Sequence, residues 1–234
     1  MKVLFIGNSH TYFNDMPALF ASMCGQLCSD TPEVTMLAFS NRSLAWHTHE
    51  YFSVRFALLY GQYDYCVIQQ YGHPFPGIAE TEPYVKQLVA LCRAAGTKPA
   101  LLMTWAKKAE PESFKEIRDA YCMLAVKYDT LLAPVGELFD ALNRTHPEIE
   151  LYWKDGAHAS PCGSYLVAAA LAACILKPKD LSRLSDQTFD FRATFDEKQP
   201  CALEDRAQIP VTLPETHAKA IRTAVEELFN EIKS

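Results

Sequence analysis

Short apolar runs alternate with longer segments that carry apolar residues at helical spacing over the first 145 residues of the chain. The short runs have the length and the Val, Leu and Ile content of strands buried on both faces. Predicted strands cover residues 3–6, 33–39, 65–68, 99–103 and 131–133, and predicted helices cover residues 15–27, 44–60, 80–95, 111–127 and 135–144. This alternation implies right-handed crossovers and an α/β fold with a parallel sheet covered by helices on both faces.

The pattern changes in the last third of the chain. Ser160 followed by Pro161 is a good N-cap and first helical residue, and it predicts a helix over residues 161–176. Residues 178–214 are irregular, with aromatic residues at 189, 191 and 195 that we expect to wrap the surface, and residues 215–232 predict an amphipathic helix. Because no internal repeat is visible, we expect a single domain over residues 1–234.

Composition excludes several classes of partner. The 234 residues are 49% hydrophobic and 21% charged, which is typical of a globular domain. The net charge of −6 argues against a nucleic-acid partner or an acidic membrane surface. The longest apolar stretch, residues 165–176, is shorter than the roughly 18 residues that span a bilayer. Since Met1 and Lys2 lead directly into the first strand, with no secretory signal pattern, we expect a cytoplasmic location.

The eight cysteines do not form a metal-binding pattern. They are scattered through apolar segments with no Cys-x-x-Cys pair, as expected for buried thiols. Cys24 and Cys28 are four positions apart on a predicted helix, but no pair of histidines accompanies them at ligand spacing. The sequence therefore predicts neither a metal nor a cofactor.

A polar cluster follows the first strand directly and contains the first candidate for chemistry. Gly7 permits a tight turn, and Ser9 comes where the strand gives way to a loop. Ligands of open α/β sheets bind outside the carboxyl ends of the strands, so a hydroxyl there faces a crevice. Ser9 is therefore a candidate nucleophile, although a serine at this place also fits a simple turn. A nucleophile would need a base and an orienting acid elsewhere in the chain.

The loop before the helix at residue 161 contains such a pair. Asp155 precedes His158 by three residues, so its carboxylate could orient the imidazole while the other ring nitrogen faces a nucleophile. The same spacing arises by chance, and it also fits a capped loop with a histidine on the surface. Only the context of the whole chain favours the catalytic interpretation.

Four blocks in a fixed order provide that context, and together they resemble the SGNH/GDSL hydrolase family. They are Gly7-Asn8-Ser9-His10-Thr11, Tyr63 to Gln69, Thr104-Trp105-Ala106 and Asp155-Gly156-Ala157-His158. The resemblance covers about residues 2–176 and is closest to a bacterial branch with a Gly-Asn-Ser start and a Gln after the third strand. It implies a flavodoxin-like three-layer α/β/α fold and ester hydrolysis, with Ser9 as nucleophile, His158 as base and Asp155 as orienting acid.

The resemblance also implies an oxyanion hole, with two departures from the family pattern. The family uses the amide of the serine, a Gly amide in the second block and an Asn side chain in the third. Here Asn41 stands in place of the Gly, and Asn tolerates the left-handed backbone better than other side chains. Gln69 replaces the Asn and offers the same N–H donors one methylene further out. We therefore expect donors from Ser9, Asn41 and Gln69; the alternatives are a turn residue at 41 and a structural glutamine at 69.

Several side chains near the predicted strand ends are candidates for a substrate pocket. Trp46, Tyr71, His73 and Trp105 could form an apolar or sugar-stacking wall, although buried packing is the commoner role of such residues. Arg42, beside the expected donor Asn41, could contact a carboxylate of a substrate. A solvated surface position is the simpler interpretation of that arginine.

These features predict a metal-independent serine esterase for small acyl esters. O-acetyl groups on carbohydrates are one substrate that the family suggests. A thioesterase or acyltransferase would use the same residues, and the altered oxyanion positions leave open a non-catalytic ligand-binding domain. A nucleotide-binding module is disfavoured because no Gly-x-Gly-x-x-Gly or Gly-x-x-x-x-Gly-Lys pattern follows the first strand.

Overall fold

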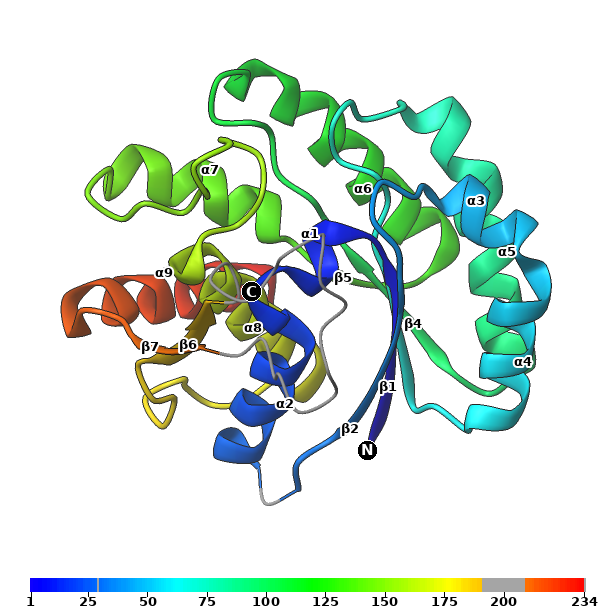
Figure 1. Cartoon of the computed structure of the whole chain (residues 1–234), viewed down its shortest axis with the longest axis horizontal. Coiled ribbons are helices and arrows are strands. Elements are labelled where there is room, and N and C mark those ends of the chain that lie inside the picture. The colour runs from blue at the N-terminus through cyan, green and yellow to red at the C-terminus, as the bar shows by residue number, and fades with distance from the viewer. Residues whose placement is uncertain (29, 191–208, 234) are drawn as a thin grey trace, which may run out of the picture.

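A five-stranded sheet forms the centre of the protein, whose computed structural model describes residues 1–28, 30–190 and 209–233 (Figure 1). All neighbouring strands are parallel. Their order is β2 (Glu33–Ala38), β1 (Lys2–Gly7), β3 (Tyr65–Ile68), β4 (Lys98–Leu102) and β5 (Leu131–Ala133). This is the doubly wound, flavodoxin-like order: β2 lies on one side of β1, and β3, β4 and β5 follow on the other side. The predicted fold and all five strands are confirmed. The strand order reverses at β1 and β3, and ligands of such sheets bind at the carboxyl ends of the strands beside the reversal.

Each face of the sheet has its own hydrophobic core. Along β1, Val3 and Phe5 point to one face while Leu4 and Ile6 point to the other, as the two-residue period of a strand requires. The first face is covered by α2 (Met16–Leu27), α7 (Val135–Thr145), α8 (Pro161–Leu176) and α9 (Glu215–Lys233). The second is covered by α3 (Leu44–His49), α4 (Tyr51–Gly61), α5 (Ile78–Ala94) and α6 (Phe114–Tyr128). The two groups of helices lie on opposite sides of the sheet in Figure 1.

Helix α8 begins where the sequence predicts. The hydroxyl of Ser160 accepts a hydrogen bond from the amide of Gly163 at 3.1 Å, and Pro161 is the first helical residue. The helix is buried on all sides because α2, α7 and α9 surround it. A Cβ at Gly163 would lie 2.2 Å from the carbonyl oxygen of Leu151, so the glycine lets the preceding loop run against the helix. That loop contains Asp155 and His158.

Two predictions about helices are wrong in detail. Residues 44–60 form two helices rather than one, because the backbone at Glu50 leaves the helical region (φ −76°, ψ 43°) between α3 and α4. Asp15 precedes α2 as expected, but its backbone is left-handed (φ 49°) and its side chain makes no capping hydrogen bond. The chain before α2 instead forms the short helix α1 (Ser9–Tyr12) and a 3₁₀ turn, η1 (Phe13–Asp15).

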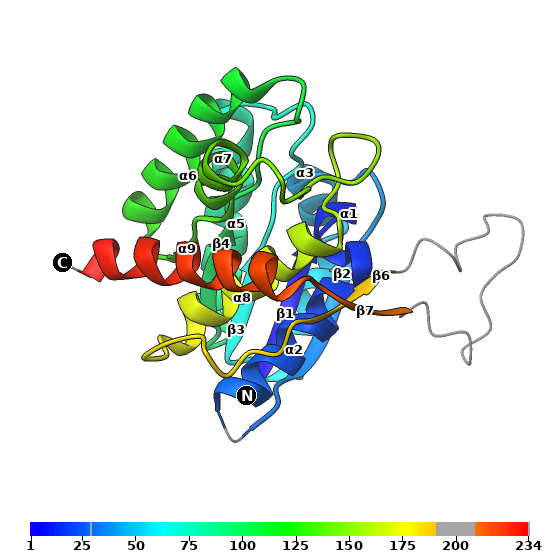
Figure 2. The same ribbon diagram turned by 90° about the vertical axis from the view of Figure 1, so that its left-hand side faces the viewer.

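The irregular segment 178–214 contains an unpredicted hairpin. Strands β6 (Gln187–Asp190) and β7 (Ile209–Thr212) pair antiparallel. β6 packs against α8, and β7 leads into the start of α9 (Figure 2). Residues 191–208, including two of the aromatic residues expected to wrap the surface, lie outside the described residues. A second 3₁₀ turn, η2 (Pro111–Ser113), precedes α6. Among the described helices, none combines the length and the apolar character that crossing a membrane requires. The single-domain organisation stays a prediction.

Candidate active site

The loop after β1 is held in place on both sides. Asn8 caps α1, since its Oδ1 accepts the amide of His10 at 3.0 Å, while the amide of Asn8 donates to Oε1 of Gln69 at 3.0 Å. A Cβ at Gly7 would lie 2.3 Å from Oγ1 of Thr11 and 2.5 Å from Oε1 of Gln69. Gly7 is therefore required for this close approach rather than for the tight turn that the sequence suggests. The result is a fixed Ser9 in the loop after β1, beside the end of β3.

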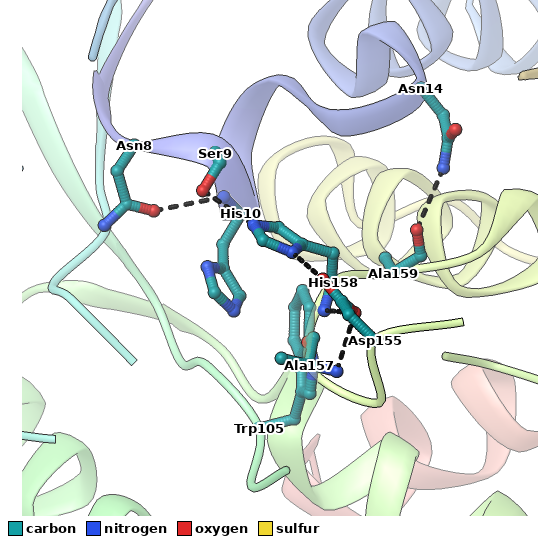
Figure 3. A network of polar contacts seen from close by, with 9 residues as sticks. All are labelled: Asn8, Ser9, His10, Asn14, Trp105, Asp155, Ala157, His158 and Ala159. Atoms are coloured by element: carbon teal, nitrogen blue, oxygen red, sulfur yellow. Dashed lines mark hydrogen bonds and ion pairs between the residues drawn. The ribbon is translucent and has the colours of Figure 1, made fainter. Parts of the chain in front are cut away.

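Ser9, His158 and Asp155 come together although Ser9 and His158 are 149 positions apart in the chain (Figure 3). Nε2 of His158 lies 2.8 Å from Oγ of Ser9, and Nδ1 lies 2.5 Å from Oδ2 of Asp155. An ionised carboxylate only accepts hydrogen bonds, so the proton of the neutral ring belongs on Nδ1. Nε2 is then the acceptor for the hydroxyl of Ser9. This is the arrangement in which an imidazole can take a proton from a serine.

Asp155 is kept in its charged form by hydrogen bonds. Burial favours the neutral carboxyl, but hydrogen bonds from the ring of His158 and from two backbone amides outweigh it and lower the pKa of Asp155 below its ordinary value. The two amides, of Ala157 and His158, donate to Oδ1 at 2.9 and 3.0 Å. The same carboxylate therefore closes the loop and orients the ring.

Side chains from distant segments support the loop, and sequence reasoning missed two of them. Asn14 donates to the carbonyl of Ala159 at 3.1 Å and to Oγ of Ser164 at 2.8 Å. The ring of Phe13 stacks on that of His158 at 4.2 Å. The one sequence signal for Asn14 is the tolerance of Asn for the left-handed backbone that it adopts (φ 53°). Nothing in the sequence indicates the stacking of Phe13.

The backbone of Asn41 is left-handed (φ 57°), as expected for a residue that stands where the family has a glycine. It occupies the third position of a turn in which the amide of Arg42 donates to the carbonyl of Phe39 at 3.2 Å, a position that favours Gly or Asn. Nδ2 of Asn8 donates to the carbonyl of Arg42 at 3.0 Å and ties this turn to the loop of Ser9. Tyr71 donates its hydroxyl to Oδ1 of Asn41 at 2.5 Å. Asn41 thus stands beside the nucleophile loop.

The side chain of Gln69, which the sequence suggests as an oxyanion donor, makes several hydrogen bonds within the protein. Its Oε1 accepts from the amide of Asn8 and, at 2.9 Å, from the hydroxyl of Thr11. Its Nε2 donates to the carbonyl of Gln70. The physical reason is burial: Gln69 is 1% exposed, and the two donors at the end of β1 need an acceptor there. Gln69 therefore holds the loop. Its Nε2 carries a second N–H that the bond to Gln70 does not use, and an oxyanion role for this N–H stays a prediction.

The four expected pocket residues divide into two kinds. Trp46, Tyr71 and His73 are half-buried; Tyr71 contacts Asn41, and the ring of His73 lies 5.0 Å from that of His10. Trp105 is 1% exposed, stacks on Phe139 at 4.2 Å and donates its Nε1 to the carbonyl of Ala157 at 2.9 Å. Trp105 therefore supports the loop of His158 instead of forming an open wall for a substrate. Its far side borders a separate cavity of about 400 Å³ between α7 and the loop at residues 147–152.

Two further histidines lie beside the catalytic candidate. The ring of His10 is 5.0 Å from that of His73 and 5.0 Å from that of His158. Burial first, and then the neighbouring histidines, hold the pKa of His10 well below its usual range. Burial, Lys107 and His158 lower the pKa of His73 to about 4. Both rings are therefore neutral at pH 7, and neither places a positive charge against His158.

The part of the chain that the structure describes contains no group of three or more His, Cys, Asp and Glu residues able to hold a metal ion. Cys24 is buried in α2, and Cys28, the residue after α2, donates its thiol to the carbonyl of Cys24. The candidate catalytic residues are Ser9, His158 and Asp155.

Comparisons with known proteins agree on the fold. No family model and no curated protein sequence matches this chain. Among solved structures, TesA is 16% identical with a TM-score of 0.60, covering 73% of this chain and 96% of its own. Axe2, an acetylxylan esterase from Geobacillus stearothermophilus, is 16% identical with a TM-score of 0.60, covering 73% and 91%. A putative GDSL-like lipase from Parabacteroides merdae is 19% identical with a TM-score of 0.56, covering 72% and 92%.

These solved structures are SGNH and GDSL hydrolases, so the chain has the fold of that class. The fold predicted from the four sequence blocks is confirmed. At identities of 16–19% the likeness concerns the fold alone, and the chemistry of this chain has to be argued from its own residues.

Proposed function

We propose that the protein is a serine ester hydrolase that works through an acyl-enzyme on Ser9. The observation that carries the proposal is the continuous hydrogen-bonded chain from Ser9 through His158 to Asp155, with contacts of 2.8 and 2.5 Å. A hydroxyl is a weak nucleophile until a base removes its proton, and His158 is already oriented to do so. Because all three hydrogen-bonded groups are present, we favour an enzyme over the non-catalytic binding domain.

In the proposed reaction, Oγ of Ser9 attacks the carbonyl carbon of the ester while Nε2 of His158 takes the hydroxyl proton. The tetrahedral intermediate collapses, the C–O bond to the alcohol breaks, and His158 returns the proton to the leaving alcohol. Water then attacks the acyl-enzyme with His158 again as base, which releases the acid and frees Ser9. Asp155 stays ionised and stabilises the imidazolium formed in each half-reaction.

The developing oxyanion needs preorganised donors, and two backbone amides are available for the role. We assign it to the amide of Ser9 and to the amide of Asn41, whose turn is tied to the nucleophile loop by the 3.0 Å bond from Asn8. One such donor has been worth about 2.7–4 kcal/mol where it was removed from another serine hydrolase. The N–H of Gln69 that the bond to Gln70 does not use is the third candidate donor.

Small acyl esters are the first substrate class to test. Axe2, which shares the fold, is an acetylxylan esterase, and this supports acetyl esters, including those on carbohydrates, as candidates. A thioesterase would use the same three residues, and no contact in the site favours a thioester over an oxygen ester.

The decisive assay follows 4-nitrophenol release from 4-nitrophenyl acetate. We expect turnover by the native protein, loss of at least about 10³-fold in kcat for Ser9→Ala, and a smaller loss for Asp155→Asn, since the acid acts only through the histidine. Chelators should leave the rate unchanged. Equal rates for the native protein and Ser9→Ala would contradict the proposal.

A further inference from the structure

Arg42 differs from every other arginine in residues 1–28, 30–190 and 209–233. Each of the other six donates at least one hydrogen bond from its guanidinium, to a carboxylate, a carbonyl or a hydroxyl; they are Arg55, Arg93, Arg118, Arg144, Arg183 and Arg222. The guanidinium of Arg42 makes no hydrogen bond and no ion pair within those ranges. In a protein with a net charge of −6, an arginine without an acidic partner is notable.

The position of Arg42 is fixed even though its hydrogen-bonding groups are unused. Its amide closes the turn onto Phe39, and its carbonyl accepts Nδ2 of Asn8, the residue before the nucleophile. Its guanidinium lies over the ring of Trp46, 5.1 Å from the ring centre. A cation held over an aromatic face loses little further freedom when it binds an anion. The backbone of Arg42 is thus tied to the catalytic loop, while its exposed guanidinium lies over Trp46 with its donors free.

Aromatic side chains lie near Arg42 and the candidate oxyanion donor Asn41. Phe39 is 45% exposed, and its ring lies 5.0 Å from that of Trp46. Tyr71 reaches across to Asn41 with its hydroxyl. Aromatic faces with one free cation among them suit an organic acid, since its apolar part can stack on the rings.

We propose that Arg42 binds a carboxylate of the substrate, so that the preferred esters are those of acidic molecules. This inference rests on the function proposed above and adds the substrate class. The planar guanidinium presents paired N–H donors that match the two oxygens of a carboxylate. The carboxylate can belong to the acyl part, as in a half-ester of a dicarboxylic acid, or to the alcohol part, as in an O-acetylated hydroxy or sugar acid.

The test compares matched esters with and without the negative charge. One pair carries the charge on the acyl part: 4-nitrophenyl hydrogen succinate and its neutral methyl ester. The other carries it on the leaving group: 3-acetoxybenzoate and its methyl ester. The readout is the ratio of kcat/KM for the acidic ester to kcat/KM for its neutral partner, which cancels effects common to both substrates.

Arg42→Gln removes the charge, and Arg55→Gln is the matched control. Arg55 is also exposed and also lies over an aromatic ring, that of Tyr51 at 5.7 Å, but on the outer surface of α4. We expect Arg42→Gln to lower the ratio by about tenfold or more in one of the two pairs, the size of a hydrogen-bonded charged contact. Arg55→Gln should leave the ratio as in the native protein, and added salt should reduce the native ratio.

Two results would overturn the inference: ratios unchanged by Arg42→Gln in both pairs, or ratios lowered equally by both variants. The pair that responds identifies which part of the substrate carries the carboxylate. Ser9→Ala is measured alongside on all four esters. If Ser9→Ala hydrolyses them at native rates, the proposed function fails. If Ser9→Ala is inactive but Arg42→Gln has the same ratios as the native protein, only the carboxylate inference fails.

Discussion

Gln69 uses both ends of its side-chain amide inside the protein. Its oxygen accepts from Asn8 and Thr11, and its nitrogen donates to the carbonyl of Gln70. The end of β3 is thereby joined to the first turn after β1, on which Ser9 stands. A residue of the chemical type expected for an oxyanion donor thus acts as a brace for the nucleophile. The bracing bonds join Gln69 to residues about 60 positions away, so they are a matter of tertiary contacts.

We predict that Gln69→Leu lowers both stability and activity. The change leaves the amide of Asn8 and the hydroxyl of Thr11 without their acceptor, and one unsatisfied buried group costs about 1–3 kcal/mol. The free energy of unfolding, measured by urea titration, should fall by at least that amount, and ester turnover should fall with it. Gln187→Leu, at an exposed glutamine of β6, is the control. A large loss of kcat with unchanged stability would instead support the oxyanion role for Gln69.

At the scale of elements, the central sheet was predictable because its strands are buried on both faces. Such strands are continuous apolar runs, and Val3 to Ile6 is one. The hairpin of β6 and β7 gave no comparable signal, since its strands are short and mostly half-buried or exposed. The break between α3 and α4 at Glu50 has neither Gly nor Pro to mark it. Local sequence therefore predicted the elements that the core surrounds and missed those shaped by their neighbours.

The candidate site divides in the same way. Ser9, Asp155 and His158 could be named from the order of four short blocks, because each type of residue has its own chemical role. The residues that hold them could not be named. Asn14 is 145 positions from the carbonyl that it binds, and Trp105 is 52 positions from Ala157. Contacts of this kind depend on the folded arrangement of distant segments, to which a single sequence gives no access.

At the scale of the whole molecule, buried histidines link folding to pH. Burial lowers the pKa of His10, His47 and His73 in the folded protein, that of His73 to about 4. In the unfolded chain a histidine titrates near its ordinary value of about 6.5. Between about pH 6.5 and pH 4 the unfolded chain therefore binds protons that the folded protein does not. Stability must fall as the pH falls through this window.

We predict that the free energy of unfolding decreases steadily from pH 6.5 to pH 4.5, and that His73→Gln makes the decrease smaller. Asp155 does not reverse this trend: its lowered pKa gives a contribution that is lost only below its ordinary value of 3.8. Urea titrations at several pH values provide the slopes, with His49→Gln, at an exposed histidine, as the control. A stability that stays level or rises on acidification would contradict the linkage, as would a native slope in His73→Gln.

The central claim is that Ser9 is a nucleophile activated by His158. The most direct measurement is intact-protein and peptide mass spectrometry after exposure to an alkyl fluorophosphonate, in which Oγ of the serine bonds to phosphorus, fluoride leaves and the histidine takes the proton. The account predicts one adduct per chain, located on Ser9, absent in Ser9→Ala and formed far more slowly in His158→Ala. An unmodified native protein, or an adduct that forms equally fast in Ser9→Ala, would contradict it.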